Sequence, residues 1–249
     1  MADGLKGRVA VVTGAAAGLG RAVAHRLARE GAAVEILDLQ DAAQVTGEIH
    51  GAGGQAHSML CDCTDEEQIA RAAKEIEGRH GRVDILVNNA GILTGRKPWH
   101  SLTKEEVNRF VQVNYIGYFL VTKAMYPLIR KSAAPRVIMV ASRTYFLANP
   151  GQMAYVASKG AVMGMTRVLA KEMGDEGITV NAVMPGMVAT PGTMEHSQEE
   201  AFNRVMNNQA IKRRVTPEHL AGLIAFLAGD DAELITGQTI ICDGGGYLH

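Results

Sequence analysis

The segment that decides the fold is Val9-Ala10-Val11-Val12-Thr13-Gly14-Ala15-Ala16-Ala17-Gly18-Leu19-Gly20. Its first four residues are continuously apolar, which is typical of a strand buried on both faces of a parallel sheet. Three glycines then precede a helical pattern that extends to Glu30. Glycines allow a tight turn and let the backbone approach a pyrophosphate at a helix N-terminus, where free N–H groups favour an anion. The segment therefore predicts the opening strand, turn and helix of a dinucleotide-binding α/β fold.

The spacing Gly-x3-Gly-x-Gly differs from the dinucleotide fingerprint Gly-x-Gly-x2-Gly, and no Lys-Ser/Thr follows as in a P-loop. Alone, the motif also fits a glycine-rich turn that binds nothing. Asp38 ends the second predicted strand and adds a specific feature. An acidic side chain there accepts hydrogen bonds from the ribose hydroxyls of NAD and repels the 2′-phosphate of NADP. We therefore expect NAD, with NADP less favoured, although a strand-end Asp can also simply begin a turn.

Short β-branched runs alternate with longer helical patterns along the whole chain. Strands are predicted at 9–12, 33–37, 55–60, 83–87, 136–140, 178–183 and 239–241, and helices at 19–30, 42–49, 66–80, 104–130, 153–174 and 217–228. This alternation predicts one Rossmann-like, doubly wound α/β domain over 1–249, with a seven-stranded parallel sheet and helices on both faces. The least regular stretch, about 186–214, is expected to form a mobile substrate loop.

The composition is that of an ordinary soluble protein, with 47% hydrophobic and 20% charged residues among 249. A net charge of −1 offers no basic surplus for nucleic acid or for an anionic membrane. The longest apolar stretch, 115–129, is too short to span a bilayer, and the N-terminus lacks a secretory pattern. We therefore expect a cytoplasmic protein with no membrane or nucleic-acid partner. Cys61 and Cys63 are expected to be small core residues, and no metal is expected.

Tyr155 and Lys159 form the main candidate for chemistry, because four-residue spacing places both side chains on one face of a helix. A free phenol has a pKa of about 10, and a neighbouring ammonium favours the phenolate and lowers that pKa. Tyr155 could then exchange a proton with an alcohol oxygen. A lone Tyr-x3-Lys is equally what an ordinary amphipathic helix provides, so the interpretation depends on the rest of the chain.

Taken with Asn88-Asn89-Ala90-Gly91 and the C-terminal Asp243-Gly244-Gly245, these motifs resemble the short-chain dehydrogenase/reductase family over essentially the whole chain. Two positions depart mildly from the family pattern: Ala141, where a second Ser is frequent, and Cys63, where Val is common. The resemblance implies a catalytic tetrad of Asn114, Ser142, Tyr155 and Lys159. It implies that Ser142 orients the substrate oxygen, that Lys159 lowers the pKa of Tyr155 and binds the nicotinamide ribose, and that Asn114 holds a water.

The resemblance also implies cofactor contacts at the ends of several strands. The implied cofactor residues are Gly14, Gly18, Leu19, Gly20, Asp38, Leu39, Asp62, Cys63, Asn89, Ala90, Gly91, Tyr155, Lys159, Pro185, Gly186, Val188 and Thr190. The expected substrate pocket is mostly apolar, which suits a small hydrophobic or aromatic secondary alcohol or ketone. Its expected members are Leu93, Ser142, Thr144, Tyr145, Gln152, Met187 and Met194. Arg143 is expected to turn away, because its neighbour Ser142 must face the site.

The sequence thus predicts an NAD-dependent oxidoreductase that interconverts a small secondary alcohol and its ketone. The helix 153–174 is apolar on more than one face, so we expect a homotetramer, with a dimer as fallback. Two alternatives stay open. A 3-oxoacyl-carrier-protein reductase shares the fold and tetrad, but that class usually takes NADPH and meets its acidic carrier through basic patches. A catalytically silent dinucleotide sensor would not need an intact tetrad.

Overall fold

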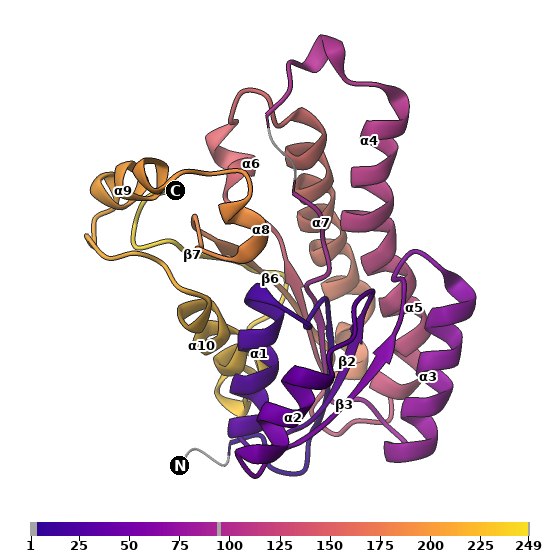
Figure 1. Ribbon diagram of the computed structural model, residues 1–249. Coiled ribbons are helices and arrows are strands. Elements are labelled where there is room, and N and C mark those ends of the chain that lie inside the picture. The colour runs from indigo at the N-terminus through magenta and orange to yellow at the C-terminus, as the bar shows by residue number, and fades with distance from the viewer. Residues whose placement is uncertain (1–3, 94–95, 249) are drawn as a thin grey trace.

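The computed structural model describes residues 4–93 and 96–248, and within them seven strands form one parallel sheet (Figure 1). The strand order is β3-β2-β1-β4-β5-β6-β7, so it reverses between β1 and β4. The strands are β1 (Val9–Thr13), β2 (Ala33–Asp38), β3 (Gln55–Leu60), β4 (Ile85–Asn88), β5 (Arg136–Val140), β6 (Thr179–Pro185) and β7 (Thr239–Cys242). The predicted sheet is confirmed. In such sheets, ligands bind beyond the carboxyl ends of the strands at the point where the order reverses.

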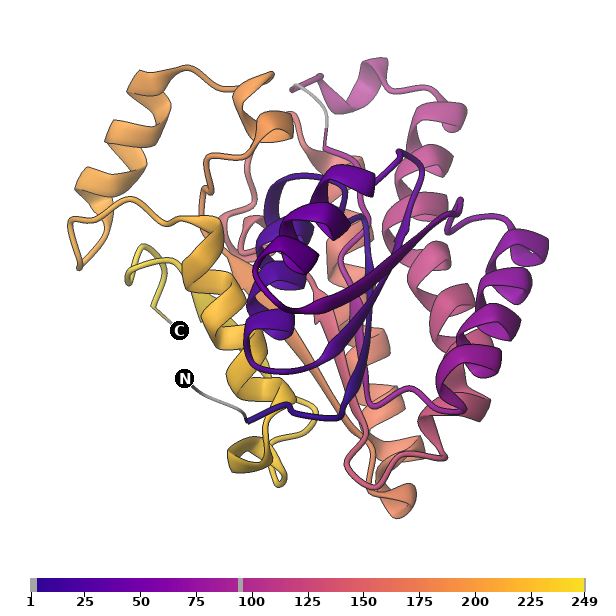
Figure 2. The same ribbon diagram turned by 60° about the horizontal axis from the view of Figure 1, so that its bottom comes forward.

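Helices cover both faces of the sheet (Figures 1 and 2). One face carries α1 (Gly18–Arg29), α2 (Ala43–Gly51) and α10 (Pro217–Ala228), and the other carries α3 (Glu66–His80), α5 (Gly117–Ile129) and α7 (Met153–Glu172). Helix α4 (Lys104–Val111) leads into α5. None of the described helices has both the length and the apolar character needed to cross a membrane.

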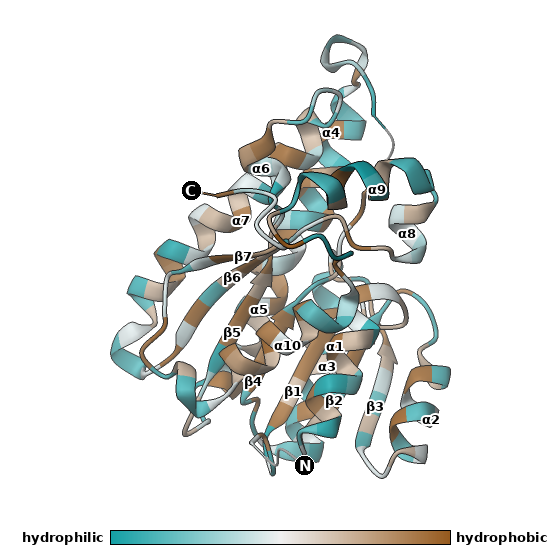
Figure 3. Ribbon diagram, turned by 90° about the vertical axis from the view of Figure 1, so that its left-hand side faces the viewer, coloured by the Kyte–Doolittle hydropathy of each residue, from teal (hydrophilic) through white to brown (hydrophobic). Residues whose placement is uncertain are grey.

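The core divides between these two faces because successive strand residues point to opposite sides. In β1, Ala10 and Val12 pack toward α1 and α10, whereas Val11 packs toward α3, α5 and α7. Every residue of β1, β4 and β5 is buried, and Figure 3 shows the central strands as mainly hydrophobic. The continuous apolar runs in the sequence therefore correspond to strands covered on both sides.

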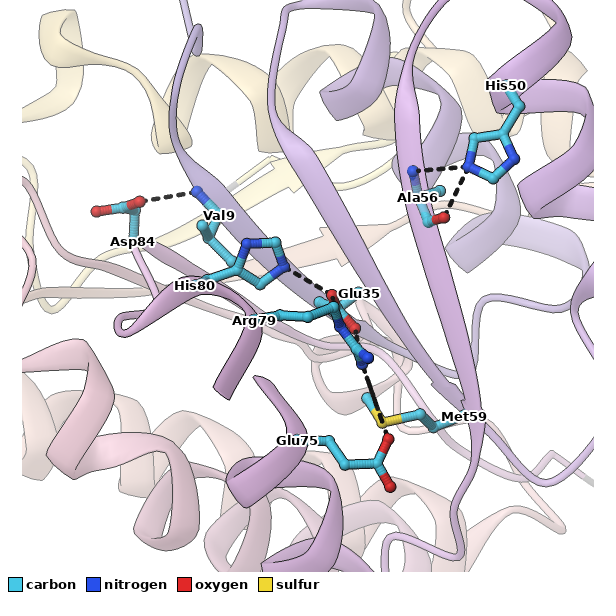
Figure 4. Close-up of polar contacts among 9 residues, drawn as sticks. All are labelled: Val9, Glu35, His50, Ala56, Met59, Glu75, Arg79, His80 and Asp84. Atoms are coloured by element: carbon cyan, nitrogen blue, oxygen red, sulfur yellow. Dashed lines mark hydrogen bonds and ion pairs between the residues drawn. The ribbon is translucent and has the colours of Figure 1, made fainter. Parts of the chain in front are cut away.

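One buried carboxylate interrupts the apolar pattern of β2. Glu35 is fully buried, and its oxygens accept hydrogen bonds from Arg79 Nε at 3.0 Å and Nη2 at 3.1 Å. His80 Nε2 lies 2.7 Å from the same carboxylate (Figure 4). The last turn of α3 thus pairs the charge that β2 buries, which is the condition under which a buried carboxylate is tolerated. This cluster holds α3 against the sheet.

Two predicted stretches differ from the structure. The single helix expected over 104–130 is divided into α4 and α5 by a π-helical segment, Gln112–Ile116. The stretch expected to be irregular contains α8 (Pro191–Met194) and α9 (Glu199–Asn208), and α9 buries Phe202. A four-residue helix, α6 (Thr144–Leu147), was also not predicted. Segments this short carry too little periodicity to be recognised from sequence.

Candidate active site

The glycine-rich turn after β1 leaves its backbone uncovered, forming a glycine cradle in which side chains at the glycine positions would clash with neighbouring atoms. Gly14 has φ +65°, and a Cβ there would lie 2.7 Å from Ala90 Cα. A Cβ on Gly20 would lie 2.1 Å from the carbonyl oxygen of Gly14. Gly18, with φ +58°, faces Thr190 across the turn. Bare backbone at the N-terminus of α1 fits the pyrophosphate of a dinucleotide.

Asp38 reaches from the end of β2 to this turn. Its Oδ2 accepts a hydrogen bond from the Ala16 N–H at 2.8 Å, and its Oδ1 accepts one from the Gln40 N–H at 2.9 Å. Leu39 beside it is 69% exposed, so it leaves an open apolar surface next to the carboxylate. The structure therefore brings Asp38 to the glycine turn, where the sequence placed the adenosine ribose.

The ends of β3 and β4 complete this half of the crevice. Asp62 Oδ1 accepts hydrogen bonds from the Thr64 N–H at 2.8 Å and hydroxyl at 2.7 Å, while Cys63 is buried in the core. Asn89 Nδ2 donates to the carbonyl oxygens of Thr13 at 2.9 Å and Gly14 at 2.8 Å. The end of β4 is thereby bonded to the end of β1, so the turn keeps its shape.

The other half of the crevice lies at the ends of β6 and β7. The Gly186 N–H donates to the carbonyl oxygen of Cys242 at 3.1 Å, and a Cβ on Gly186 would lie 2.9 Å from Asp243 Cβ. Val188 is buried beyond it, and Thr190 caps α8 by accepting a hydrogen bond from the Thr193 N–H. Thr190 faces the turn after β1, because a Cβ on Gly18 would lie 3.5 Å from Thr190 Cβ.

Ser142 and Tyr155 come together at the end of β5. Ser142 is buried, and its Oγ lies 2.8 Å from Thr144 Oγ1. Burial raises the pKa of the Tyr155 phenol, and the nearby Ser142 hydroxyl offsets only part of that rise. The Tyr155 ring meets Phe110 edge-to-face, with centroids 6.2 Å apart. A phenol that lies beside a serine hydroxyl can bind the oxygen of an alcohol or a ketone together with that hydroxyl.

The pKa of Tyr155 is not lowered below its ordinary value, whereas a lowering was expected from the neighbouring Lys159. Lys159 Nζ donates to the Val140 carbonyl oxygen at 2.8 Å and to the Tyr118 hydroxyl oxygen at 3.1 Å. Lys159 is buried, and this burial lowers the pKa of its ammonium to about 7. The expected lowering of the Tyr155 pKa is therefore absent from this structure, because burial of the phenol outweighs any stabilisation of its anion.

Asn114 lies in the π-helical segment and is fully buried. Its Oδ1 accepts from the Ile92 N–H at 2.8 Å, and its Nδ2 donates to the Ile92 carbonyl oxygen and the Ser158 hydroxyl, each at 3.1 Å. A Cβ on Gly91 would lie 3.0 Å from Asn114 Oδ1 and 3.4 Å from Lys159 Nζ. Asn114 thus joins the segment after β4 to α7, and π-bulges of this kind frequently occur at functional sites.

A cavity of about 370 Å³ opens beside Tyr155, between α4, the start of α7 and the segment after β4. Its apolar wall includes Ile92, Leu102 and Phe110, and its charged wall includes Arg96, Lys97, Glu106 and Arg109. Lys97 Nζ pairs with Glu106 at 2.7 Å, so the two exposed arginines leave the cavity positive. Of the predicted substrate residues, Gln152 lines this cavity. Substrate contact by Leu93, Thr144, Tyr145, Met187 and Met194 stays a prediction.

Three features of the site were not predicted from the sequence: Phe110, Tyr118 and the ion pair of Arg143 with Asp243. Phe110 and Tyr118 lie four residues before and after Asn114, and that helical spacing could have indicated a shared face. The third feature is the partner of Arg143: the Nη1 of Arg143 lies 2.7 Å from Asp243 Oδ2, and both side chains are buried. No local signal could have paired two residues that lie 100 positions apart.

Comparison with known proteins gives a consistent family. The family model described as Enoyl-(Acyl carrier protein) reductase matches residues 14–247. The chain is 37% identical to the 3-oxoacyl-[acyl-carrier-protein] reductase FabG of Thermotoga maritima, over 97% of this chain and 98% of that protein.

Solved structures agree with this assignment. A 7α-hydroxysteroid dehydrogenase complexed with NADH superimposes with a TM-score of 0.93 at 30% identity, covering 100% of this chain and 97% of that chain. A gluconate 5-dehydrogenase structure from Beutenbergia cavernae, with bound NADP at low occupancy, superimposes with a TM-score of 0.91 at 36% identity, covering 99% of each chain. The glycine cradle, the Ser142–Tyr155 pair and these similarities agree, and the chain belongs to the short-chain dehydrogenase/reductase family of nicotinamide-dinucleotide oxidoreductases.

Proposed function

We propose that this protein is an NAD-dependent dehydrogenase that interconverts a small, largely apolar secondary alcohol and its ketone. The observation that carries the proposal is the proximity of Ser142 and Tyr155 at the end of β5, beside a cavity with an apolar wall. Two hydroxyl groups that converge on one oxygen suit a substrate whose reacting group is a carbonyl or a hydroxyl. The size of the cavity suits a small molecule.

In this mechanism, the bound nicotinamide supplies or accepts the hydride, and the protein supplies orientation and a proton. Ser142 donates a hydrogen bond to the substrate oxygen and holds it beside Tyr155. Because burial raises the pKa of Tyr155, the phenol is neutral near pH 7, the form that gives a proton to a ketone. For alcohol oxidation, Tyr155 must first lose this proton, so the oxidation rate should increase with pH.

NAD preference follows from Asp38. Its carboxylate is bonded to the glycine turn and ends the strand that neighbours β1. A 2′-phosphate would bring negative charge against this carboxylate, whereas free ribose hydroxyls can donate hydrogen bonds to it.

Substitution of Tyr155 by Phe tests the proposal. The variant should lose about 10²–10⁴-fold in kcat, the usual contribution of a general acid or base, while its Kd for NAD stays near that of the wild type. Reduced-nicotinamide absorbance with a panel of secondary alcohols measures the first quantity, and calorimetry measures the second. Tyr126→Phe is the matched control, because Tyr126 is bonded to Glu176 on the surface. Substantial turnover by Tyr155→Phe would refute the role of Tyr155.

A second candidate is reduction of a 3-oxoacyl thioester carried by an acidic carrier protein. The 37% identity to a reductase of that name favours it, and so does the exposed positive charge of Arg96 and Arg109 at the cavity. The comparison is between a 3-oxoacyl carrier-protein thioester and free ketones, each with NADH and NADPH. Faster turnover of the thioester with NADPH would favour the reductase. NAD binding without turnover of any substrate would favour a silent sensor.

A further inference from the structure

Two tyrosines belong to this part of the site: Tyr155, one helical turn before Lys159 on α7, and Tyr118, which contacts the buried ammonium of Lys159. Tyr155 borders the cavity, whereas Tyr118 is 1% exposed and projects from α5 into the core. The Tyr118 hydroxyl donates to the Val140 carbonyl oxygen at 3.2 Å and accepts from Lys159 Nζ at 3.1 Å. Lys159 Nζ itself donates to the same Val140 oxygen at 2.8 Å. The three groups thus form a closed triangle at the last residue of β5.

We propose that Tyr118 is a positioning residue that holds the Lys159 ammonium, in its charged form, against the strand that carries Ser142. This inference rests on the proposed function, since it assigns a role within the same site. A second contact supports it: Lys159 Nζ lies over the Tyr118 ring, 5.0 Å from the centroid. Both the hydroxyl lone pair and the face of the ring are negative, and both therefore favour the ammonium.

The surroundings explain why Tyr118 supports the charge without taking part in proton transfer. Burial, together with the nearby Tyr155 and Cys63, raises the pKa of Tyr118 well above its usual value. Tyr118 therefore keeps its proton, which points to Val140, and presents only a lone pair to Lys159. Tyr118 from α5 is thus the titratable group in contact with Lys159, and the titratable groups that act on Tyr118 are Tyr155 from α7 and Cys63 from the segment after β3.

The burial of Lys159 determines in which direction the Tyr118 hydroxyl shifts the pKa of this lysine. A buried amine loses its proton more easily, and each acceptor at the ammonium opposes that loss. Removing the Tyr118 hydroxyl should therefore lower the pKa of Lys159 further and remove positive charge near Tyr155 at neutral pH. The phenolate of Tyr155 is then less favoured near neutral pH, the range in which Lys159 loses its charge. Alcohol oxidation should slow near pH 7 and recover as pH increases.

The first test compares pH profiles of kcat/KM for alcohol oxidation. Tyr118→Phe, which keeps the ring, should reduce kcat/KM at pH 7 by about 3- to 10-fold, the value of one hydrogen bond, with a smaller loss at high pH. Tyr118→Leu, which also removes the ring, should show a larger decrease in kcat/KM at pH 7. Tyr126→Phe is the same substitution on the same helix, and it should keep the wild-type profile. A lower Tm with an unchanged profile would show that Tyr118 is only a packing residue and would overturn the proposal.

The second test needs no turnover, so it separates failure of this inference from failure of the proposed function. The Lys159 side chain is titrated by NMR in the free protein, and the difference between each protein and its Lys159→Met derivative isolates the Lys159 signal. In the Tyr118→Phe background, the midpoint of Lys159 should fall by about 0.5 to 1 pH unit, the same 3- to 10-fold effect. An unchanged midpoint refutes the role of Tyr118. Absence of turnover with a shifted midpoint refutes only the proposed reaction.

Discussion

At the scale of single residues, the surroundings of a side chain determine its role more than its type does. Tyr118 and Tyr155 carry the same phenol, yet one is closed inside the core and the other borders a cavity. Asp38 and Glu35 are both carboxylates of β2, but Glu35 is neutralised by Arg79 in the interior, whereas Asp38 ends the strand beside a backbone turn. A free carboxylate at a ligand crevice discriminates between ligands of different charge.

Asp38→Asn should therefore narrow the preference for NAD over NADP. The amide keeps an oxygen that can accept the hydrogen bond from the Ala16 N–H, so the substitution removes charge while sparing the turn. Like-charge contacts cost several kcal/mol. We therefore expect the ratio of kcat/KM with NAD to kcat/KM with NADP to fall by about 10- to 100-fold. Steady-state kinetics with both cofactors measures this ratio, and Asp231→Asn on the surface provides the control. Equal efficiency of the wild type with both cofactors would contradict the assignment.

At the scale of elements, α8 and α9 lie beyond the carboxyl ends of the strands. Backbone hydrogen bonds connect the segment after α9 to the segment after β7. After α9, the Ala210 and Ile211 N–H groups donate to the carbonyl oxygens of Gly245 and Gly244 at 3.2 Å and 2.8 Å. Asp243, just before these glycines, pairs with Arg143, the neighbour of Ser142. The base of α9 is thus connected to the strand end that carries Ser142, the proposed catalytic serine. We retain the hypothesis that this segment covers the substrate.

Met194 is the residue best placed to test that hypothesis, because it is 62% exposed and its loss leaves the core intact. Met194→Ala should change the ratio of kcat/KM for a large and a small alcohol by about 3- to 10-fold, with little change in NAD affinity, because one adaptable apolar side chain contributes roughly that much discrimination. Leu234→Ala, which truncates a distant residue with 91% exposure, is the control. Phe202→Ala would be harder to interpret, since Phe202 is buried beneath the Arg214 guanidinium.

Hydrogen exchange tests independently whether α8 and α9 close over a bound substrate. If α8 and α9 close over a substrate, their amides should gain protection when NAD and an alcohol bind. An unchanged size preference together with equal protection in both states would refute the lid.

At the scale of the whole molecule, α7 exposes a stripe of small and apolar residues. Met153, Ala157, Gly164 and Val168 are exposed, and their spacing places them on one side of the helix. Val168 is 54% exposed, and Phe119 on α5 is 45% exposed. An apolar helix face of this kind is suited to packing against a second copy of the chain around a two-fold axis.

We therefore expect a homotetramer, with a dimer as fallback, and we expect Val168→Glu to dissociate it. A charge buried without a partner at an interface costs several kcal/mol, which is enough to separate subunits at micromolar concentration. Light scattering coupled to gel filtration measures the mass, and Leu234→Glu should leave it unchanged. A wild-type protein that is a stable monomer at micromolar concentration would disprove the expectation.

Most of the fold and the composition of the site could be predicted from the sequence, for a local physical reason. Apolar runs such as Val9–Val12 specify buried strands wherever they occur, and Gly14 needs its positive φ whatever surrounds it. Because the strands are parallel, their carboxyl ends lie at one edge of the sheet, so Asp38, Asn89 and Ser142 could be expected along that edge.

Only the tertiary structure decided what these groups do to one another. Lys159 binds Tyr118 and Val140, which lie 41 and 19 positions away, and Arg143 pairs with Asp243 across 100 positions. The pKa of Tyr155 was predicted with the wrong sign because spacing along a helix shows which groups are neighbours but not how deeply they are buried. Burial depends on how the whole chain packs, and in this site it outweighs the local pairing of charges.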